Sequence, residues 1–164
     1  MKENKYIDLS ILLTKDTPVF PGEPNIIFKK HANIKENTYN EHQITINTHF
    51  GTHMDFPYHM IDDGKKSSDF KLENFIGKGK VININNPDLN SIEDEDVFLL
   101  YSEHIEKGIY NLLNDVPVLD ENLVDFLITK RPKMLLLDIP TPDKFPYPIH
   151  KKILGNDILI VENV

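Results

Sequence analysis

The sequence predicts a single α/β domain, and three observations support this class. Runs of strand length occupy residues 97–101, 134–137 and 157–161, and all their side chains except Asp157 are apolar, which is typical of buried strands. Residues 121–128 show the i, i+3, i+4 apolar spacing of an amphipathic helix, and residues 149–154 suit one or two helical turns. With 164 residues and 40% hydrophobic side chains, the chain can build one sizeable core.

The first third of the chain is predicted to hold three short strands. Residues 6–10 alternate polar and apolar side chains, residues 26–28 form an apolar triplet, and residues 43–48 alternate again. In the last of these strands, Ile44 and Ile46 would lie on the face that packs against the core. This strand leads directly into a histidine-rich segment.

The middle of the chain is predicted to be mostly loop. Residues 60–70 are charged and contain glycine, so they should form an exposed loop, followed by a turn at 72–75. Residues 80–84 alternate like a strand and end in Asn-Asn-Pro-Asp, a strong turn signal. Ser91 is suited to cap a short helix over residues 91–96, whose acidic side chains would face solvent.

The last third carries the strongest signals for regular structure. The helix over residues 121–128 should end before the next proline, and residues 134–137 should form a central strand. Asp138 follows that strand, where it either lines a site or holds the next turn. The final strand, over residues 157–161, should present Glu162 at its tip.

Overall charge and composition narrow the class of partner. The net charge is −8 and no basic patch is visible, which argues against a nucleic acid and favours small molecules or proteins. No apolar run reaches membrane-spanning length, and residues 1–5 lead into polar sequence rather than the apolar core of a signal peptide. We therefore expect a cytoplasmic protein, and the absence of cysteine fits a reducing compartment.

Residues 49–59, His-Phe-Gly-Thr-His-Met-Asp-Phe-Pro-Tyr-His, concentrate three histidines and one aspartate. Imidazole and carboxylate groups bind zinc, manganese or iron, and the chain has no thiolate to compete. A helix would point Asp55 away from His49 and His53, whereas a straight strand would separate the first and last histidines by about 33 Å. Only a curled backbone gathers these side chains, so we infer a looped metal cradle. The alternative is a surface loop whose histidines occur by chance.

The histidine-rich segment resembles a long and specific signature, present here as His49-x-Gly51-Thr52-His53-x-Asp55-x-Pro57-x-His59. The signature is that of the metal-dependent cyclase family, which includes kynurenine formamidase (arylformamidase) and isatin hydrolase. Residues 17–24 resemble that family's N-terminal proline-glycine loop, and His150 with residues 160–163 resembles its late metal-binding segment. The resemblance implies a swivelling β/β/α-type single domain over residues 1–164, with a mixed sheet or barrel flanked by helices. It also implies that the family's C-terminal strand segment is missing.

The resemblance implies a metal site built from two distant parts of the chain. His49, His53 and Asp55 would hold one divalent ion, zinc or manganese, and Asp55 would reach toward a second ion. His150 and Glu162 would complete that second site, so one or two ions are expected. These assignments require early and late parts of the chain to converge on a shared cation.

The resemblance also implies roles for His59 and Phe20. His59 would act as general acid and base and protonate the leaving amine, or else serve as a further metal ligand or orient Asp55. Phe20 would help to wall the substrate pocket, or else fill the core. In one departure, relatives commonly carry Arg-Thr-Gly-Trp after the 97–101 strand, where this chain has Ser-Glu-His at residues 102–104.

Two functions follow from these expectations. The first is hydrolysis of a small amide, formamide or lactam by a metal-activated water, as in arylformamidases. The second is a catalytically inactive metal-binding or regulatory module of the same fold. Because the last strand would be an uncovered sheet edge, we also expect a homo-oligomer, a dimer or a tetramer.

Overall fold

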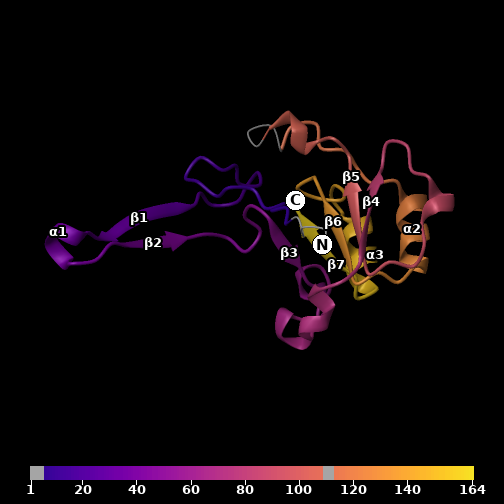
Figure 1. The fold of residues 1–164 in the computed structure, drawn as a ribbon, viewed down its shortest axis with the longest axis horizontal. Helices are drawn as coiled ribbons and strands as arrows, with labels where there is room; N and C mark the ends of the chain where they lie inside the picture. The colour runs from indigo at the N-terminus through magenta and orange to yellow at the C-terminus, as the bar shows by residue number, and fades with distance from the viewer. Residues whose placement is uncertain (1–5, 109–112) are drawn as a thin grey trace, which may run out of the picture.

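The computed structural model of the chain describes residues 6–108 and 113–164, so the polar residues 1–5 lie outside it. It shows a body built on a five-stranded sheet and an arm that extends away from this body (Figure 1). The sheet has the order β3 (His53–Asp55), β7 (Leu159–Glu162), β6 (Met134–Leu137), β5 (Val97–Tyr101) and β4 (Gly79–Asn83). Strands β4 to β7 run parallel, and β3 pairs antiparallel with β7. The predicted α/β class with a mixed sheet is confirmed.

Two helices cover one face of the sheet. Helix α2 (Glu121–Thr129) starts after Asp120, whose side chain accepts a hydrogen bond from the Leu123 N–H at 2.9 Å. Helix α3 (Pro148–Gly155) has a proline in its first turn, where no N–H is needed. The main core joins both helices to this face of the sheet through Phe98, Leu100, Leu135, Leu137, Ile160, Leu123, Val124, Leu127, Ile153 and Leu154. No helix within residues 6–108 and 113–164 is long and apolar enough to cross a membrane.

The segment that follows β3 covers the opposite face of the sheet. Val97, Met134 and Leu159 are aligned across three neighbouring strands and are buried there. The side chains packed against them include Phe56, Phe70 and Phe75. This segment contains three short 3-10 turns, at Pro57–His59 (η1), Ser67–Asp69 and Leu72–Phe75. Both faces of the sheet are therefore covered.

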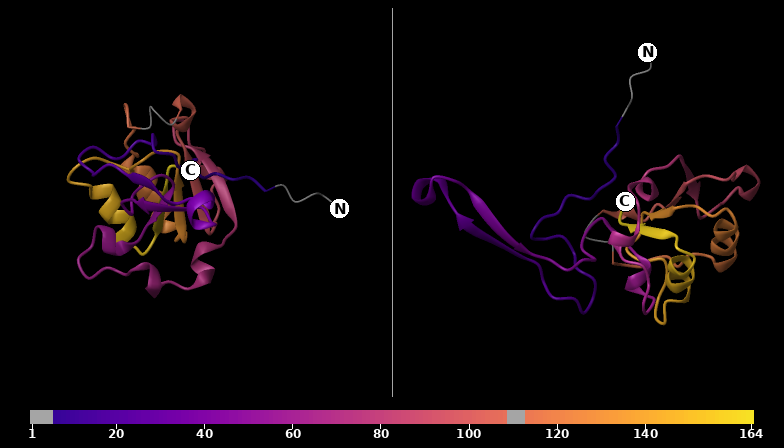
Figure 2. Two further views of the ribbon diagram at one scale, coloured as in Figure 1. Left: turned by 90° about the vertical axis from the view of Figure 1, so that its left-hand side faces the viewer. Right: turned by 90° about the horizontal axis from the view of Figure 1, so that it is seen from below.

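The arm is a hairpin formed by β1 (Ile27–Ala32), the single helical turn α1 (Ile34–Asn37) and β2 (Glu41–Thr45), as Figures 1 and 2 show. The sequence indicated strands here, but the expected burial of Ile44 and Ile46 is wrong, since they are 53% and 50% exposed. Strand β2 pairs with β1 in a separate two-stranded sheet that stands off the body. Neither face of that sheet reaches the core.

Three further expectations are wrong. Residues 6–10 belong to no strand of the described chain, because their alternating side chains lie in solvent with no sheet beside them. Residues 91–96 form no α-helix, because the Ser91 hydroxyl donates to the Asp88 carbonyl oxygen instead of capping a following turn. The last strand is not a sheet edge, because β7 lies between β3 and β6.

Candidate metal centre

The paired strands β3 and β7 form the floor of the candidate site. Side chains alternate along a strand, so His53 and Asp55 project from the same face of β3. The antiparallel register places Glu162 opposite His53 and Ile160 opposite Asp55. Because Ile160 packs in the core with α2 and α3, this face of the strand pair is turned toward the helices. Residues widely separated in sequence thus become neighbours.

His49 reaches the site through a turn at Gly51. Gly51 has a φ of 68°, and an added Cβ would lie 2.1 Å from the Leu13 side chain, so glycine suits this position. The Gly51 carbonyl oxygen accepts a hydrogen bond from Asn163 Nδ2 at 2.9 Å and lies 3.0 Å from His53 Nδ1. The second contact leaves Nε2 of His53 facing the site. The curled backbone is present as predicted, although the sequence did not indicate the short strand β3.

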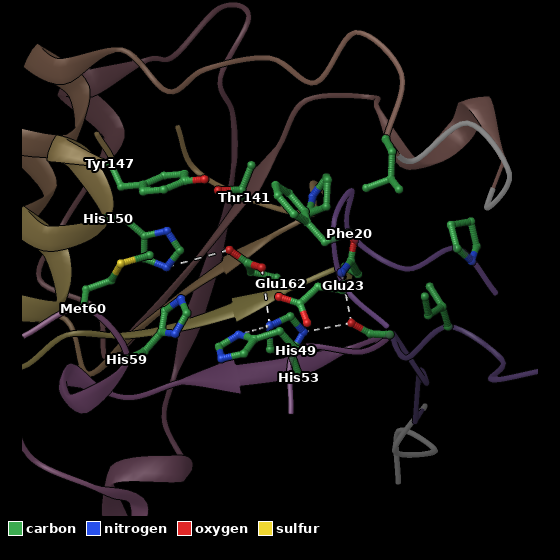
Figure 3. A pocket seen from close by; sticks show the side chains of 16 residues that line it. Phe20, Glu23, His49, His53, His59, Met60, Thr141, Tyr147, His150 and Glu162 are labelled. Carbon is green, nitrogen blue, oxygen red and sulfur yellow. Dashed lines mark hydrogen bonds and ion pairs between the residues drawn. The ribbon is translucent and has the colours of Figure 1, made fainter. Parts of the chain in front are cut away.

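Helix α3 supplies His150 from the other side of the site (Figure 3). Buried Asp143 accepts hydrogen bonds from the backbone N–H groups of Ile149 at 2.6 Å and His150 at 3.3 Å. Its other oxygen lies 4.0 Å from His150 Nδ1, while Nε2 of the same ring lies 2.9 Å from Asp55 Oδ2. Asp143 therefore holds the start of the helix whose histidine faces the cluster.

Asp55 lies at the centre of the cluster. Its Oδ1 atom is 2.8 Å from His49 Nδ1 and 3.4 Å from His53 Nε2. On the far side, His53 Nε2 is 3.4 Å from Glu162 Oε2, and His150 Nε2 is 4.0 Å from Glu162 Oε1. The structure thus brings together the five residues that the sequence pointed to as metal ligands.

The cluster fits a divalent cation. Asp55 and Glu162 are buried, and Glu162 Oε1 has no hydrogen-bond partner in the described chain. Buried acceptors are normally paired, so this oxygen suits a positive ion. Among the residues that the structure describes, two groups have ligand atoms within 4.8 Å of one another: His49, Asp55 and His59, and His53, Asp55 and Glu162. Imidazole and carboxylate donors match zinc and manganese.

Without a cation, Asp55 favours the ionised form and Glu162 favours the neutral form. Burial opposes ionisation of Asp55, but the surrounding imidazoles, His150 first among them, hold the pKa of its carboxyl well below the usual value. Burial raises the pKa of Glu162 well above the usual value, and the negative charges of Asp55 and Asp143 raise it further. An ionised Glu162 therefore destabilises the metal-free fold.

Replacing Glu162 with glutamine should stabilise the metal-free protein at neutral pH. Glutamine keeps the size of the side chain and removes the buried charge. Because the pKa of Glu162 is raised in the folded state, the wild type loses stability as pH rises above the ordinary value of 4.5, and the variant does not. We expect the free energy of unfolding at pH 7 to rise by about 1–3 kcal/mol.

Urea unfolding of chelator-treated proteins across a pH series measures this difference. Glu73→Gln, at an exposed position, is the matched control and should leave stability nearly unchanged. Added zinc or manganese should stabilise the wild type more than Glu162→Gln. Equal unfolding curves for wild type and variant at every pH would contradict the expectation.

His59 lies at the edge of the cluster on turn η1 (Figure 3). The centre of its ring is 3.9 Å from that of His49 and 5.3 Å from that of His150. Loss of water around the ring lowers the pKa of His59 to about 4, so its imidazole is neutral at pH 7. A neutral imidazole can accept a proton as a base or bind a metal ion as a ligand.

A cavity of about 210 Å³ opens beside the cluster (Figure 3). Its apolar lining includes Ile11, Pro18, Phe20, Met60, Pro140 and Tyr147. Phe20 is 37% exposed, so it contributes to the cavity wall and does not fill the core. The cluster residues His49, His53, His59, His150 and Glu162 border the same cavity. An apolar group can therefore lie next to the candidate metal ligands.

Several residues of the site were missed by the sequence reasoning. Asp143 and Tyr147 lie just before helix α3. Tyr147 stands between two prolines with a φ of 62°, and its ring points at the cavity. Asn163 directly follows Glu162 and holds the Gly51 carbonyl oxygen. The sequence signal that could have indicated Tyr147 is the pair of prolines on either side of it, because proline restricts the backbone angle φ.

Asp138 has a structural role in this fold. It accepts hydrogen bonds from the Ser102 N–H and hydroxyl and from the His104 N–H at 2.7–3.1 Å. All three residues are buried, and none is among the residues that line the cavity. Through Asp138, Ser102 and His104 thus tie the end of β5 to the end of β6.

Comparisons with known proteins identify the family. The family described as "Putative cyclase" matches residues 7–144, and the chain belongs to this family. A kynurenine formamidase of Bacillus anthracis is 28% identical over 177 residues, covering 100% of this chain and 84% of the relative.

Solved structures share the fold. Isatin hydrolase A from Labrenzia aggregata has a TM-score of 0.79 at 20% identity, covering 96% of this chain and 79% of that one. A predicted metal-dependent hydrolase from Bacillus stearothermophilus has a TM-score of 0.74 at 19% identity, covering 96% and 80%. The predicted resemblance to cyclase-family enzymes, which include hydrolases of C–N bonds, is confirmed.

Proposed function

We propose that the protein hydrolyses a small amide, formamide or lactam, in the manner of an arylformamidase, and that it depends on a bound divalent metal. One observation carries this proposal: three imidazoles and two buried carboxylates meet beside a largely apolar cavity, which all of them except Asp55 line. Membership in the cyclase family and the similarity to a kynurenine formamidase support a formamide as substrate.

One or two ions of zinc or manganese would be held by His49, His53, Asp55, His150 and Glu162. Asp55 belongs to both groups of close ligand atoms and presents one oxygen toward His49 and His53 and the other toward His150. If two ions bind, Asp55 is the residue that they share. The unpartnered Oε1 atom of buried Glu162 supports this assignment.

A bound ion of this kind polarises a carbonyl group and brings the pKa of water down to about 7. His59 borders the cavity with a neutral ring, so a ring nitrogen would take the proton that the attacking water gives up and deliver it to the leaving amine. Phe20, Met60 and Tyr147 pack around the apolar part of the substrate and exclude water from it.

Removal of the metal tests the proposal. The chelator-treated protein should lose at least about 100-fold of its rate on an N-formyl arylamine, and added zinc or manganese should restore it. Release of the arylamine gives the rate, and elemental analysis gives the metal content. A metal-stripped sample with undiminished activity would falsify the proposal.

Substrate screening separates the enzyme from a binding module of the same fold. A panel of formamides, lactones and cyclic imides should reveal at least one substrate. Protein that binds metal stoichiometrically and turns over none of them would be a binding or regulatory module.

A further inference from the structure

Glu23 is an acidic side chain of the cavity wall that the proposed hydrolysis does not use. It lies outside both groups of close ligand atoms, unlike Glu162, which lines the same cavity. The Glu23 carboxylate points into the cavity (Figure 3). Among residues 6–108 and 113–164, no lysine or arginine lines this cavity. Glu23 therefore brings a negative charge into the cavity without a cationic side chain to balance it there.

A tight turn fixes Glu23 beside Phe20. The Glu23 N–H donates a hydrogen bond to the Phe20 carbonyl oxygen at 3.0 Å, which closes a turn over residues 20–23. Pro21 stands at the second position of this turn and Gly22 at the third, with a φ of 93°, which is the pattern of a type II turn. Because both ends of the turn line the cavity, an aromatic ring and a carboxylate are presented next to each other.

Asn47, at the base of the arm, holds the Glu23 carboxylate in place. Its Nδ2 atom donates a hydrogen bond to Glu23 Oε2 at 2.9 Å and lies 3.3 Å from the Pro24 carbonyl oxygen. The contact with Asn47 uses Oε2 and leaves Oε1 for a ligand. A side chain that is already held in position loses less conformational freedom when a ligand binds to it.

The charges of the site determine which chemical group suits Glu23. The ionised carboxylates of Asp55 and Glu162 would balance one bound divalent ion, so Glu23 supplies the remaining negative charge. An ionised carboxylate accepts hydrogen bonds and cannot donate them, so it attracts a protonated amine and repels a second carboxylate. The ring of Phe20 beside it suits an aryl group that carries the amine.

We propose that Glu23 determines substrate specificity by binding a protonated amine of the substrate. The preferred substrates are then aryl amides or formamides that carry an ammonium group on a short side chain. The amide lies at the candidate metal ligands, the aryl group lies against Phe20, and the ammonium group donates hydrogen bonds to Glu23. This inference rests on the proposed function for the reacting amide, whereas binding of the amine requires no turnover.

Binding of the released amines tests this subsite without turnover. Meta-aminobenzylamine carries an ammonium group at neutral pH, and meta-aminobenzyl alcohol is a neutral molecule of the same size. The zinc-loaded wild type should bind the ammonium compound about 10-fold more tightly than the alcohol, as expected for one hydrogen-bonded charge pair. NMR titration of each compound measures the two dissociation constants.

Substitutions at Glu23 assign the preference to this side chain. Glu23→Gln removes the charge, keeps the size and can still accept the hydrogen bond from Asn47, so it should abolish the preference. Glu23→Lys should reverse it. Glu41→Gln removes the same charge from an exposed position on the arm and should keep the preference. A wild type that binds both compounds equally, or a preference that Glu23→Gln retains, would overturn the proposal.

The N-formyl derivatives of the same two amines give a second readout. The wild-type kcat/KM should be about 10-fold higher for the ammonium substrate than for the alcohol, and Glu23→Gln should remove this difference. A residue that only shapes the loop would change both rates by the same factor. A binding preference without hydrolysis would support the amine subsite and contradict the proposed function. Hydrolysis of both substrates without any preference would support the proposed function and contradict the subsite.

Discussion

Replacing Asp55 with asparagine should lower kcat/KM for an N-formyl arylamine by about 10³-fold or more and remove most of the bound metal. Such a loss corresponds to roughly 4 kcal/mol of transition-state stabilisation. Asp55 is common to both groups of candidate ligands, and three imidazole nitrogens lie within 3.4 Å of its oxygens. Asparagine keeps the shape but replaces one oxygen with an amide nitrogen that cannot bind a cation. Steady-state kinetics and elemental analysis of the same preparation measure both effects.

The control for Asp55→Asn is Asp62→Asn, which makes the same chemical change on an exposed loop residue. It should retain activity and metal. If Asp55→Asn keeps a full complement of metal, the cluster is not the metal site. If it loses metal and keeps its activity, catalysis does not depend on the ion.

Replacing His59 with alanine should reduce kcat by about 10²- to 10⁴-fold and leave the metal content unchanged. This range is typical of losing a positioned general acid or base. His59 stacks on His49 at the border of the cavity, where a leaving amine can approach its ring. Free imidazole added to the assay should restore part of the lost rate, because it can enter the space that the side chain leaves.

The same variant separates the alternative roles of His59. Its ligand atom lies within 4.8 Å of those of His49 and Asp55, close enough for a metal ligand. Loss of metal together with activity, without rescue by imidazole, would make His59 a ligand. His42→Ala, at an exposed position on the arm, is the control and should change neither quantity.

The metal-binding segment could be predicted because its chemistry is local. Ligand type and spacing in residues 49–59 exclude a helix and a straight strand without reference to the rest of the chain. Strands β5 and β6 could also be predicted, because a strand buried on both faces is a continuous apolar run in the sequence. Helix α2 showed its apolar stripe and begins beside a capping aspartate.

The exposure of the arm's apolar side chains could not be predicted, because it depends on which other part of the protein packs against the arm. The alternation in residues 43–48 is the same whether its apolar side faces the core or solvent. Residues 6–10 have the pattern of a strand but no neighbour in the described chain with which to pair. Asp143 was missed for a similar reason. It affects the site by accepting hydrogen bonds from backbone N–H groups at the start of α3, which the sequence does not show.

The pairing of β3 with β7 sets the order in which the site can be assembled during synthesis. His53 leaves the ribosome early, but Glu162 is its cross-strand partner and emerges only after the intervening strands and helices. The nascent polypeptide therefore holds an incomplete set of donors until translation has passed residue 162. An ion that needs Glu162 as one of its ligands could therefore bind only after translation has passed that residue.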